Sequence, residues 1–116
     1  MSKRRVVITG LGCITALGEN ADEFFGAICQ GKSGIATIES FDTSAYPVHF
    51  GGEVKHFEVT KYIDFRESKR MDRFSQFAVA AAIQAVKESG LDFSKEDPYR
   101  MGVIVGTGIG GIKEIE

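Results

Sequence analysis

The feature that most constrains this chain is a helical stretch that is apolar on nearly every side. The segment "FAVAAAIQAV" at residues 77–86 has one polar residue, Gln84. A surface helix shows one apolar stripe, whereas a helix that is apolar all round must be covered all round. The wider pattern predicts a helix from Met71 to Ser89 that ends at Gly90. We therefore expect this helix to lie in the interior of a layered protein.

Two apolar, β-branched segments, each closed by glycine, predict buried strands. They are "RVVITGLG" at residues 5–12 and "MGVIVG" at residues 101–106. Such runs are typical of parallel strands that are covered on both faces. Residues 35–42 fit a short strand or a turn, and the irregular pattern of residues 43–60 predicts loops with one hairpin. The order strand, helix, irregular segment, helix, strand indicates an α/β protein with helices layered on a sheet.

A first helix is expected between the first strand and the irregular segment. Asn20 can cap its N-terminus, and Glu23 three residues later completes a capping box. Phe24 and Phe25 contribute to its apolar side, and Gly31 is a natural stop.

Composition and charge limit the classes of partner. The 116 residues contain 14 cations and 16 anions, for a net charge of -2. The global charge therefore indicates neither nucleic acid nor a membrane surface, and any basic site must be local. No apolar run approaches the roughly 18–20 residues of a membrane helix. Two cysteines are too few for a disulfide framework, so we expect a reducing, cytoplasmic location.

Two glycine loops raise the question of dinucleotide binding. The stretch "GTGIGG" at residues 106–111 fits the spacing G-x-G-x-x-G, but the chain ends before a ribose-binding acid could follow. The opening loop "GLGCIT" at residues 10–15 has threonine where the third glycine belongs. Each loop meets part of the pattern. A Rossmann-like module stays open, although glycines that let a strand turn beneath a packed helix are the simpler interpretation.

A basic cluster follows the irregular segment. Four basic residues have the spacing i, i+3, i+4 and i+7: Arg66, Lys69, Arg70 and Arg73. If the segment is one helix, all four lie on one face. Acidic residues are interleaved, so one interpretation is a solvated face with weak ion pairs. The other is a cationic ridge that binds an acidic partner.

The cysteines and histidines of this chain do not have the positions or spacing of a catalytic or metal site. Cys13 and Cys29 do not lie at a helix N-terminus, where a thiol gains a lowered pKa, so we expect inert core cysteines. His49 and His56 have no C-x-x-C or H-x-x-x-H partner, so they are expected on the surface or in packing. We expect no metal and no cofactor.

Five motifs in register resemble one family. They are "RRVVITGLGCITALG", "GKSGI", "FDTS", "KRMDRFSQFAVAAAIQA" and "RMGVIVGTGIGG". In this order and spacing they resemble the N-terminal part of β-ketoacyl-acyl-carrier-protein synthases, in particular the synthase II type of bacterial fatty acid synthesis. The resemblance covers residues 3–116. Condensing enzymes of polyketide synthesis share this opening and are not excluded.

The resemblance implies a fold and an assembly. The family has the thiolase fold, in which two similar halves stack in layers α-β-α-β-α. Residues 1–116 would then be the N-terminal part of the first half, and the complete enzyme a homodimer. The ending "GIKEIE" resembles the start of a further helix, which agrees with an incomplete fold. We expect this segment alone to be insoluble or molten.

The resemblance also implies a reaction. The family joins acyl-enzyme to malonyl-acyl carrier protein by decarboxylating Claisen condensation, with a cysteine nucleophile and two histidines. All three motifs would lie beyond Glu116, so no catalytic residue is assigned here. Gly108 and Ile109 are assigned to the acyl pocket, where Ile109 would limit acyl length. Alternatively, Ile109 simply packs beneath a helix.

The same resemblance implies a binding partner for the basic cluster. Positions matching Arg66, Lys69 and Arg70 belong to the docking patch for acyl carrier protein, which is small and acidic. Arg73 has no clear counterpart and is at most a helper. A non-catalytic module that docks an acidic carrier protein is the remaining alternative.

Overall fold

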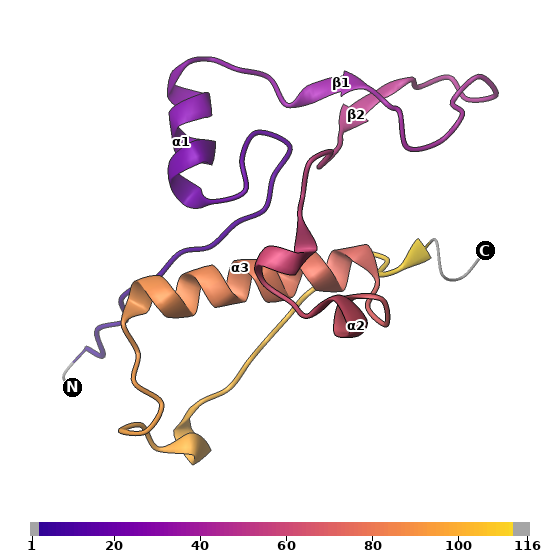
Figure 1. Cartoon of the computed structure of the whole chain (residues 1–116). Coiled ribbons are helices and arrows are strands. Elements are labelled where there is room, and N and C mark those ends of the chain that lie inside the picture. Colours follow the sequence, from indigo (N-terminus) through magenta and orange to yellow (C-terminus); the bar gives the residue numbers. More distant parts are fainter. Residues whose placement is uncertain (1–2, 113–116) are drawn as a thin grey trace.

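The computed structural model describes residues 3–112. Its elements, in chain order, are α1 (Ala21–Cys29), β1 (Ile35–Thr37), β2 (Phe50–Gly52), the 3-10 turn η1 (Val59–Lys61), α2 (Phe65–Ser68), α3 (Arg73–Ser89) and the 3-10 turn η2 (Pro98–Arg100). Helix α3 lies across the middle, with α1 and the β1–β2 hairpin on one side and η2 on the other (Figure 1). None of the described helices is both long and apolar enough to cross a membrane.

Helix α1 confirms the predicted caps. The side chain of Asn20 accepts a hydrogen bond from Glu23 N at 2.9 Å. The Glu23 carboxylate reaches back to Glu19 N at 2.9 Å, one residue earlier than the usual capping box. After the helix, Gly31 adopts a positive φ of 67°, which ends the helix as expected.

Helix α3 begins two residues later than predicted and ends as predicted. Asp72 is its N-cap, and Gly90 follows with a left-handed φ of 65°. Ala80 is 0% exposed, whereas Val79 and Ile83 keep 36% and 40% of their surface exposed. The described residues therefore cover only part of this apolar helix.

The two predicted buried strands are wrong for the described residues. Residues 5–12 and 101–106 are assigned to no strand and pair with no other segment. Val6 is 93% exposed and Ile104 is 99% exposed. A strand needs a partner for its backbone groups and cover for its faces, and residues 3–112 supply neither to these segments.

The described residues form one small antiparallel sheet. Strand β1 pairs with β2, and Ile35 lies opposite Gly52. The short strand within residues 35–42 is therefore confirmed. The hairpin expected within residues 43–60 is wrong as placed, because β2 pairs with β1, which lies before that segment. The helix start expected at the end of the chain falls largely on residues 113–116, which lie outside the described residues.

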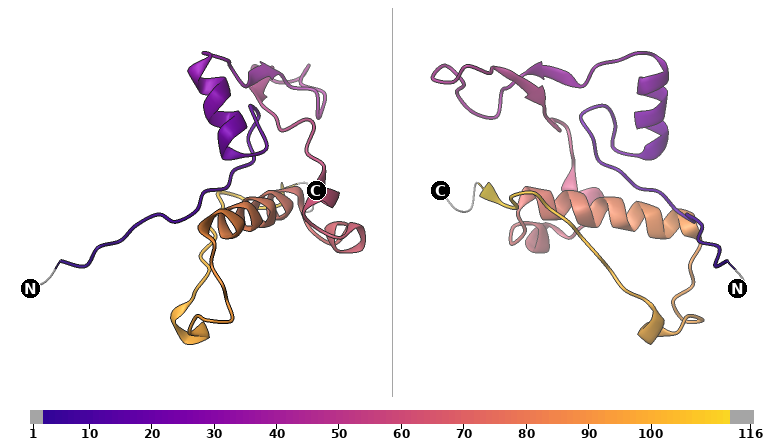
Figure 2. Two further views of the ribbon diagram at one scale, coloured as in Figure 1. Left: turned by 60° about the vertical axis from the view of Figure 1, so that its left-hand side comes forward. Right: turned by 180° about the vertical axis from the view of Figure 1, so that it is seen from behind.

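Both extended segments contact α3, at different ends. A Cβ added at Gly10 would lie 2.9 Å from Ser89 N, and one added at Gly12 would lie 2.9 Å from the Cβ of Gln84. The end of the second segment instead reaches Phe74, whose ring would lie 3.8 Å from a Cβ at Gly110. The two segments thus meet opposite halves of α3, as the turned views show (Figure 2).

Candidate functional site

The predicted basic cluster lies on a broken helix. Helix α2 is only four residues long and ends at Ser68, and residues 69–72 form a turn before α3. The prediction that four basic residues line one helical face is therefore wrong. Aspartate favours N-cap positions, and one lies at the start of α2 and another at the start of α3. Asp64 accepts from Arg66 N at 2.8 Å, and Asp72 is the N-cap of α3.

All four basic residues of the cluster are exposed: Arg66, Lys69, Arg70 and Arg73. Within residues 3–112 none of them joins an ion pair. The Lys69 Nζ lies over the Phe65 ring, 4.4 Å from its centroid, so the ammonium group makes a cation–π contact on an exposed residue. This surface can attract an acidic partner.

Arg73 is separated from the other three by its contacts. Its Nη2 donates to the backbone oxygen of Val54 at 2.6 Å. Its guanidinium carbon lies 4.9 Å from the ring centroid of Phe77. The Arg73 guanidinium is therefore engaged by Val54 and Phe77, which leaves Arg66, Lys69 and Arg70 as the basic cluster.

The backbone of the turn is held from α3. The side-chain amide of Gln76 donates to Ser68 O at 2.9 Å and to Met71 O at 3.0 Å. Ser68 is 4% exposed and Gln76 is half-buried. The turn is thus fixed to the helix that follows it.

The second glycine segment ends beside this turn. Among residues 3–112, no atom beyond the chain neighbours lies within 4 Å of a Cβ built at Gly108, and Ile109 is 74% exposed. Packing of Ile109 beneath a helix is therefore not seen among residues 3–112. Gly111 packs closely against the Asp72 carboxylate. The structure thus brings the predicted pocket edge and the basic turn to the same end of α3.

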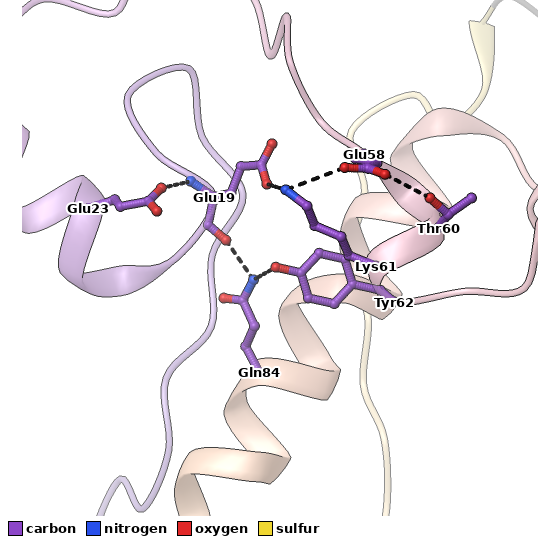
Figure 3. Close-up of polar contacts among 7 residues, drawn as sticks. All are labelled: Glu19, Glu23, Glu58, Thr60, Lys61, Tyr62 and Gln84. Carbon is purple, nitrogen blue, oxygen red and sulfur yellow. Dashed lines mark hydrogen bonds and ion pairs between the residues drawn. The ribbon is translucent and has the colours of Figure 1, made fainter.

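The opening loop is attached to α3 by Gln84, the one polar residue of the apolar segment 77–86 (Figure 3). Its Nε2 donates to Glu19 O at 2.6 Å and to Tyr62 Oη at 2.9 Å. Its Oε1 accepts from Cys13 N at 3.2 Å. These bonds satisfy the polar atoms of a half-buried amide and fix the loop against the helix.

A small ion-pair network lies above this amide. Lys61 Nζ lies 3.5 Å from a carboxylate oxygen of Glu19 and 3.7 Å from one of Glu58. The Glu19 charge is the main cause of the raised pKa of Lys61. Lys61 is exposed, so the pair adds little stability.

The opening loop lacks the geometry of a phosphate-binding loop. Such a loop places glycine amides directly at a helix N-terminus. Here Gly10 and Gly12 pack on α3, and α1 begins only at Ala21. The Asn20 side chain already accepts the Glu23 amide of that helix. The loop's glycines therefore serve close packing.

A cavity of about 630 Å³ lies beside this loop. Its lining includes Glu53, whose carboxylate already accepts hydrogen bonds within the chain. The Glu53 carboxylate accepts from Ser40 N at 3.0 Å and from Glu39 N at 2.8 Å. Hydrogen bonds from Ser40 and Glu39 lower the pKa of Glu53. The Glu53 carboxylate, which lines the cavity, therefore helps to order the β1–β2 hairpin.

The cysteines and histidines show no constellation for chemistry. Burial, with a smaller effect of the Glu23 charge, raises the pKa of the half-buried Cys13, which favours the unreactive thiol. Cys29 is exposed, so the expectation of a core position is wrong for it. The Nδ1 of His49 lies 3.2 Å from the Thr43 hydroxyl, and His56 is exposed.

Comparison with known sequences decides the family. The sequence profile described as "Beta-ketoacyl synthase, N-terminal domain" matches residues 3–116. The chain belongs to the β-ketoacyl synthase family. It is 44% identical over 116 residues to 3-oxoacyl-[acyl-carrier-protein] synthase 2 of Synechocystis sp. and 43% identical to the protein of the same name from Vibrio harveyi. In both cases the alignment spans 100% of this chain and 28% of the relative, so the chain covers less than a third of these relatives' length.

A solved structure supports the same β-ketoacyl synthase assignment. The ishigamide ketosynthase/chain length factor superposes with a TM-score of 0.72 at 36% sequence identity. The superposition covers 80% of this chain and 23% of that one. The predicted fold class, a portion of the thiolase-like layered α/β fold, is therefore confirmed.

Sequence reasoning found the basic residues but missed the two amides that organise the site. Gln84 stood out as the one polar interruption of the apolar segment, and this signal could have marked it as a contact to the opening loop. Gln76 lies just before that segment, where a polar residue is unremarkable. Only the structure shows that it reaches back to the turn.

Proposed function

We propose that this chain is the N-terminal part of a β-ketoacyl-acyl-carrier-protein synthase of the synthase II type. The observation that carries the proposal is identity of 42–44% across 97–100% of the chain to proteins named 3-oxoacyl-[acyl-carrier-protein] synthase 2. The complete enzyme would elongate an acyl chain by decarboxylating condensation with malonyl-acyl carrier protein. Its nucleophilic cysteine and two histidines would lie in the rest of the protein, beyond Glu116.

The basic turn supplies the carrier dock in this proposal. Arg66, Lys69 and Arg70 are exposed, and no ion pair within residues 3–112 occupies them. A local cationic surface on a chain of net charge -2 attracts an acidic carrier selectively. It raises the rate of encounter and makes binding sensitive to salt.

The second glycine segment supplies an edge of the acyl pocket. Gly108 and Ile109 are uncovered in residues 3–112 and lie next to the N-terminal end of α3. A bulky aliphatic side chain at Ile109 would then limit the length of the acyl chain. In this proposal the pocket edge and the carrier dock lie near each other.

The assembly and location follow from the family resemblance. The complete enzyme would be a cytoplasmic homodimer that uses no metal or cofactor and binds neither nucleic acid nor membrane. The two thiols, Cys13 and Cys29, are free, which is consistent with a reducing compartment.

Charge reversal at the turn tests the proposal. In the complete gene product that carries this chain, Lys69→Glu with Arg70→Glu should raise the KM for acyl carrier protein at least tenfold at low salt. The ratio of this KM to the KM for an acyl-CoA should rise by the same factor, because only the carrier needs the dock. The matched control is Lys32→Glu with Lys87→Glu, the same charge change at exposed positions away from the turn. An unchanged ratio in the turn variant would contradict the dock.

A condensing enzyme of the polyketide type is the second candidate. The solved ketosynthase/chain length factor favours it, since it shares 36% identity and the fold. The synthase 2 proteins share 42–44%, which favours the first candidate. Turnover with the host's own fatty acid carrier as the best substrate would support fatty acid synthesis. Turnover only with a different carrier would support the second candidate.

A further inference from the structure

One side chain of α3 holds both ends of the exposed turn. The two amide hydrogens of Gln76 are donated to different carbonyls, Ser68 O at 2.9 Å and Met71 O at 3.0 Å. The residues between these carbonyls are Lys69 and Arg70. A single planar group with two donors therefore brackets the two exposed cations.

The helix is broken between these two carbonyls. Helix α2 has four residues and ends at Ser68, and Met71 lies in the segment that connects it to α3. Within the turn, Arg70 N donates to Glu67 O at 2.9 Å and Met71 N donates to Ser68 O at 3.2 Å. These bonds are local and do not link the turn to α3. Gln76 makes that link.

We propose that Gln76 is a positioning residue for carrier docking, an inference that rests on the function proposed above. It does not touch the carrier. It fixes the backbone at both ends of Lys69–Arg70 relative to α3, so the two cations keep one orientation without the carrier having to order them. A preformed surface loses less conformational entropy on binding, so it binds more tightly.

The same helix provides a matched control. Gln84 lies eight residues later and is also half-buried, and its amide likewise donates to two oxygens, Glu19 O and Tyr62 Oη. It holds the opening loop and makes no bond to residues 64–72. Gln76→Leu and Gln84→Leu remove the same group from the same helix, one beside the dock and one away from it.

The test compares carrier and small-molecule kinetics in the complete gene product. We expect Gln76→Leu to raise the ratio of the KM for acyl carrier protein to the KM for acyl-CoA by about three- to tenfold. Gln84→Leu should change both KM values by the same factor and leave the ratio unchanged. A ratio for Gln76→Leu equal to that of Gln84→Leu would overturn the proposal, since a merely structural role affects both substrates alike.

Two further variants keep the outcomes distinct. If Gln76→Leu does not fold, Gln76→Met takes its place, because it keeps the unbranched shape without the amide, and the same ratio decides. Lys69→Glu with Arg70→Glu is measured in the same assay. If that variant leaves the ratio unchanged, the dock itself and the role of Gln76 both fail. If it raises the ratio and the Gln76 variants do not, only the role of Gln76 fails.

Discussion

The two glycine segments have similar spacing but opposite surroundings. In the opening segment, Gly10 and Gly12 lie so close to α3 that an added Cβ would clash with the helix backbone at Ala85 and Ala81. In the second segment, nothing lies within 4 Å of a Cβ at Gly106 or Gly108. Glycine serves close packing in the first segment, whereas the second leaves its glycines uncovered within residues 3–112.

This difference shows why G-x-G spacing does not identify a function. The opening loop satisfies most of a nucleotide-loop pattern, yet its glycines are required by the approach of a helix. The second segment satisfies the full spacing, but within residues 3–112 no helix approaches Gly106 or Gly108 within 4 Å of an added Cβ. The surroundings of each glycine decide its role.

The largest expected effect is a difference in the free energy of unfolding between glycine-to-alanine variants of the two segments. In the complete gene product, Gly12→Ala should lower the free energy of unfolding by about 3 kcal/mol or more, because the methyl group meets backbone that cannot move aside. Gly108→Ala should cost less, because within residues 3–112 no atom lies within 4 Å of a Cβ there and its φ is not positive. Denaturant unfolding followed by circular dichroism measures both.

Gly26→Ala is the control for the substitution itself. Gly26 lies within α1, and a Cβ there meets nothing within 4 Å. We expect it to stabilise the protein by about 0.5–1 kcal/mol, because alanine favours the helix. Equal losses for Gly12→Ala and Gly108→Ala would show that the comparison of the two segments is mistaken.

A second prediction sharpens the role of the exposed segment. Ile109→Ala should shift the products toward longer acyl chains by one or more extension cycles, because a smaller side chain relieves the limit on length. The thermal midpoint should change little. Product analysis by mass spectrometry gives the answer, and an unchanged length distribution would count against Ile109 as a pocket residue.

The smallest effect concerns pH and the opening loop. Hydrogen bonds from Glu19 N and then from Asn20 lower the pKa of Glu23 below its ordinary value of 4.5. A lowered pKa contributes stability that is present above that ordinary value and is lost as pH falls through the lowered one. The native protein should therefore melt slightly above Glu23→Gln at pH 7. The difference should vanish between about pH 5 and pH 3. A difference independent of pH would contradict this assignment.

Local signals predicted the helices well. Asn20, Gly31 and Gly90 were recognised at helix ends because caps depend on neighbouring residues and on backbone conformation. The break between α2 and α3 was missed, since Asp72 in a run of alternating charges resembles a member of an ion-pair series. The basic residues were predicted from the sequence, but the prediction that they share one helical face was wrong.

Features that depend on distant partners could not be predicted in the same way. Residues 5–12 and 101–106 have strand-like sequences, but a sequence pattern does not supply the neighbouring strand that makes a ladder. The role of Gln76 depends on a turn that forms only because α2 stops at Ser68. The acyl-pocket assignment of Gly108 and Ile109 came from the family resemblance and remains a prediction.

The intact mass of the native gene product tests the central claim most directly. The account proposes that these residues form the N-terminal part of a condensing enzyme, and the chain spans 28% of the length of relatives such as the Synechocystis protein. Mass spectrometry of the protein from its native source should therefore give a mass several times the 12.6 kDa of this chain. A native mass of 12.6 kDa would contradict the claim and leave a docking module without its own condensing site.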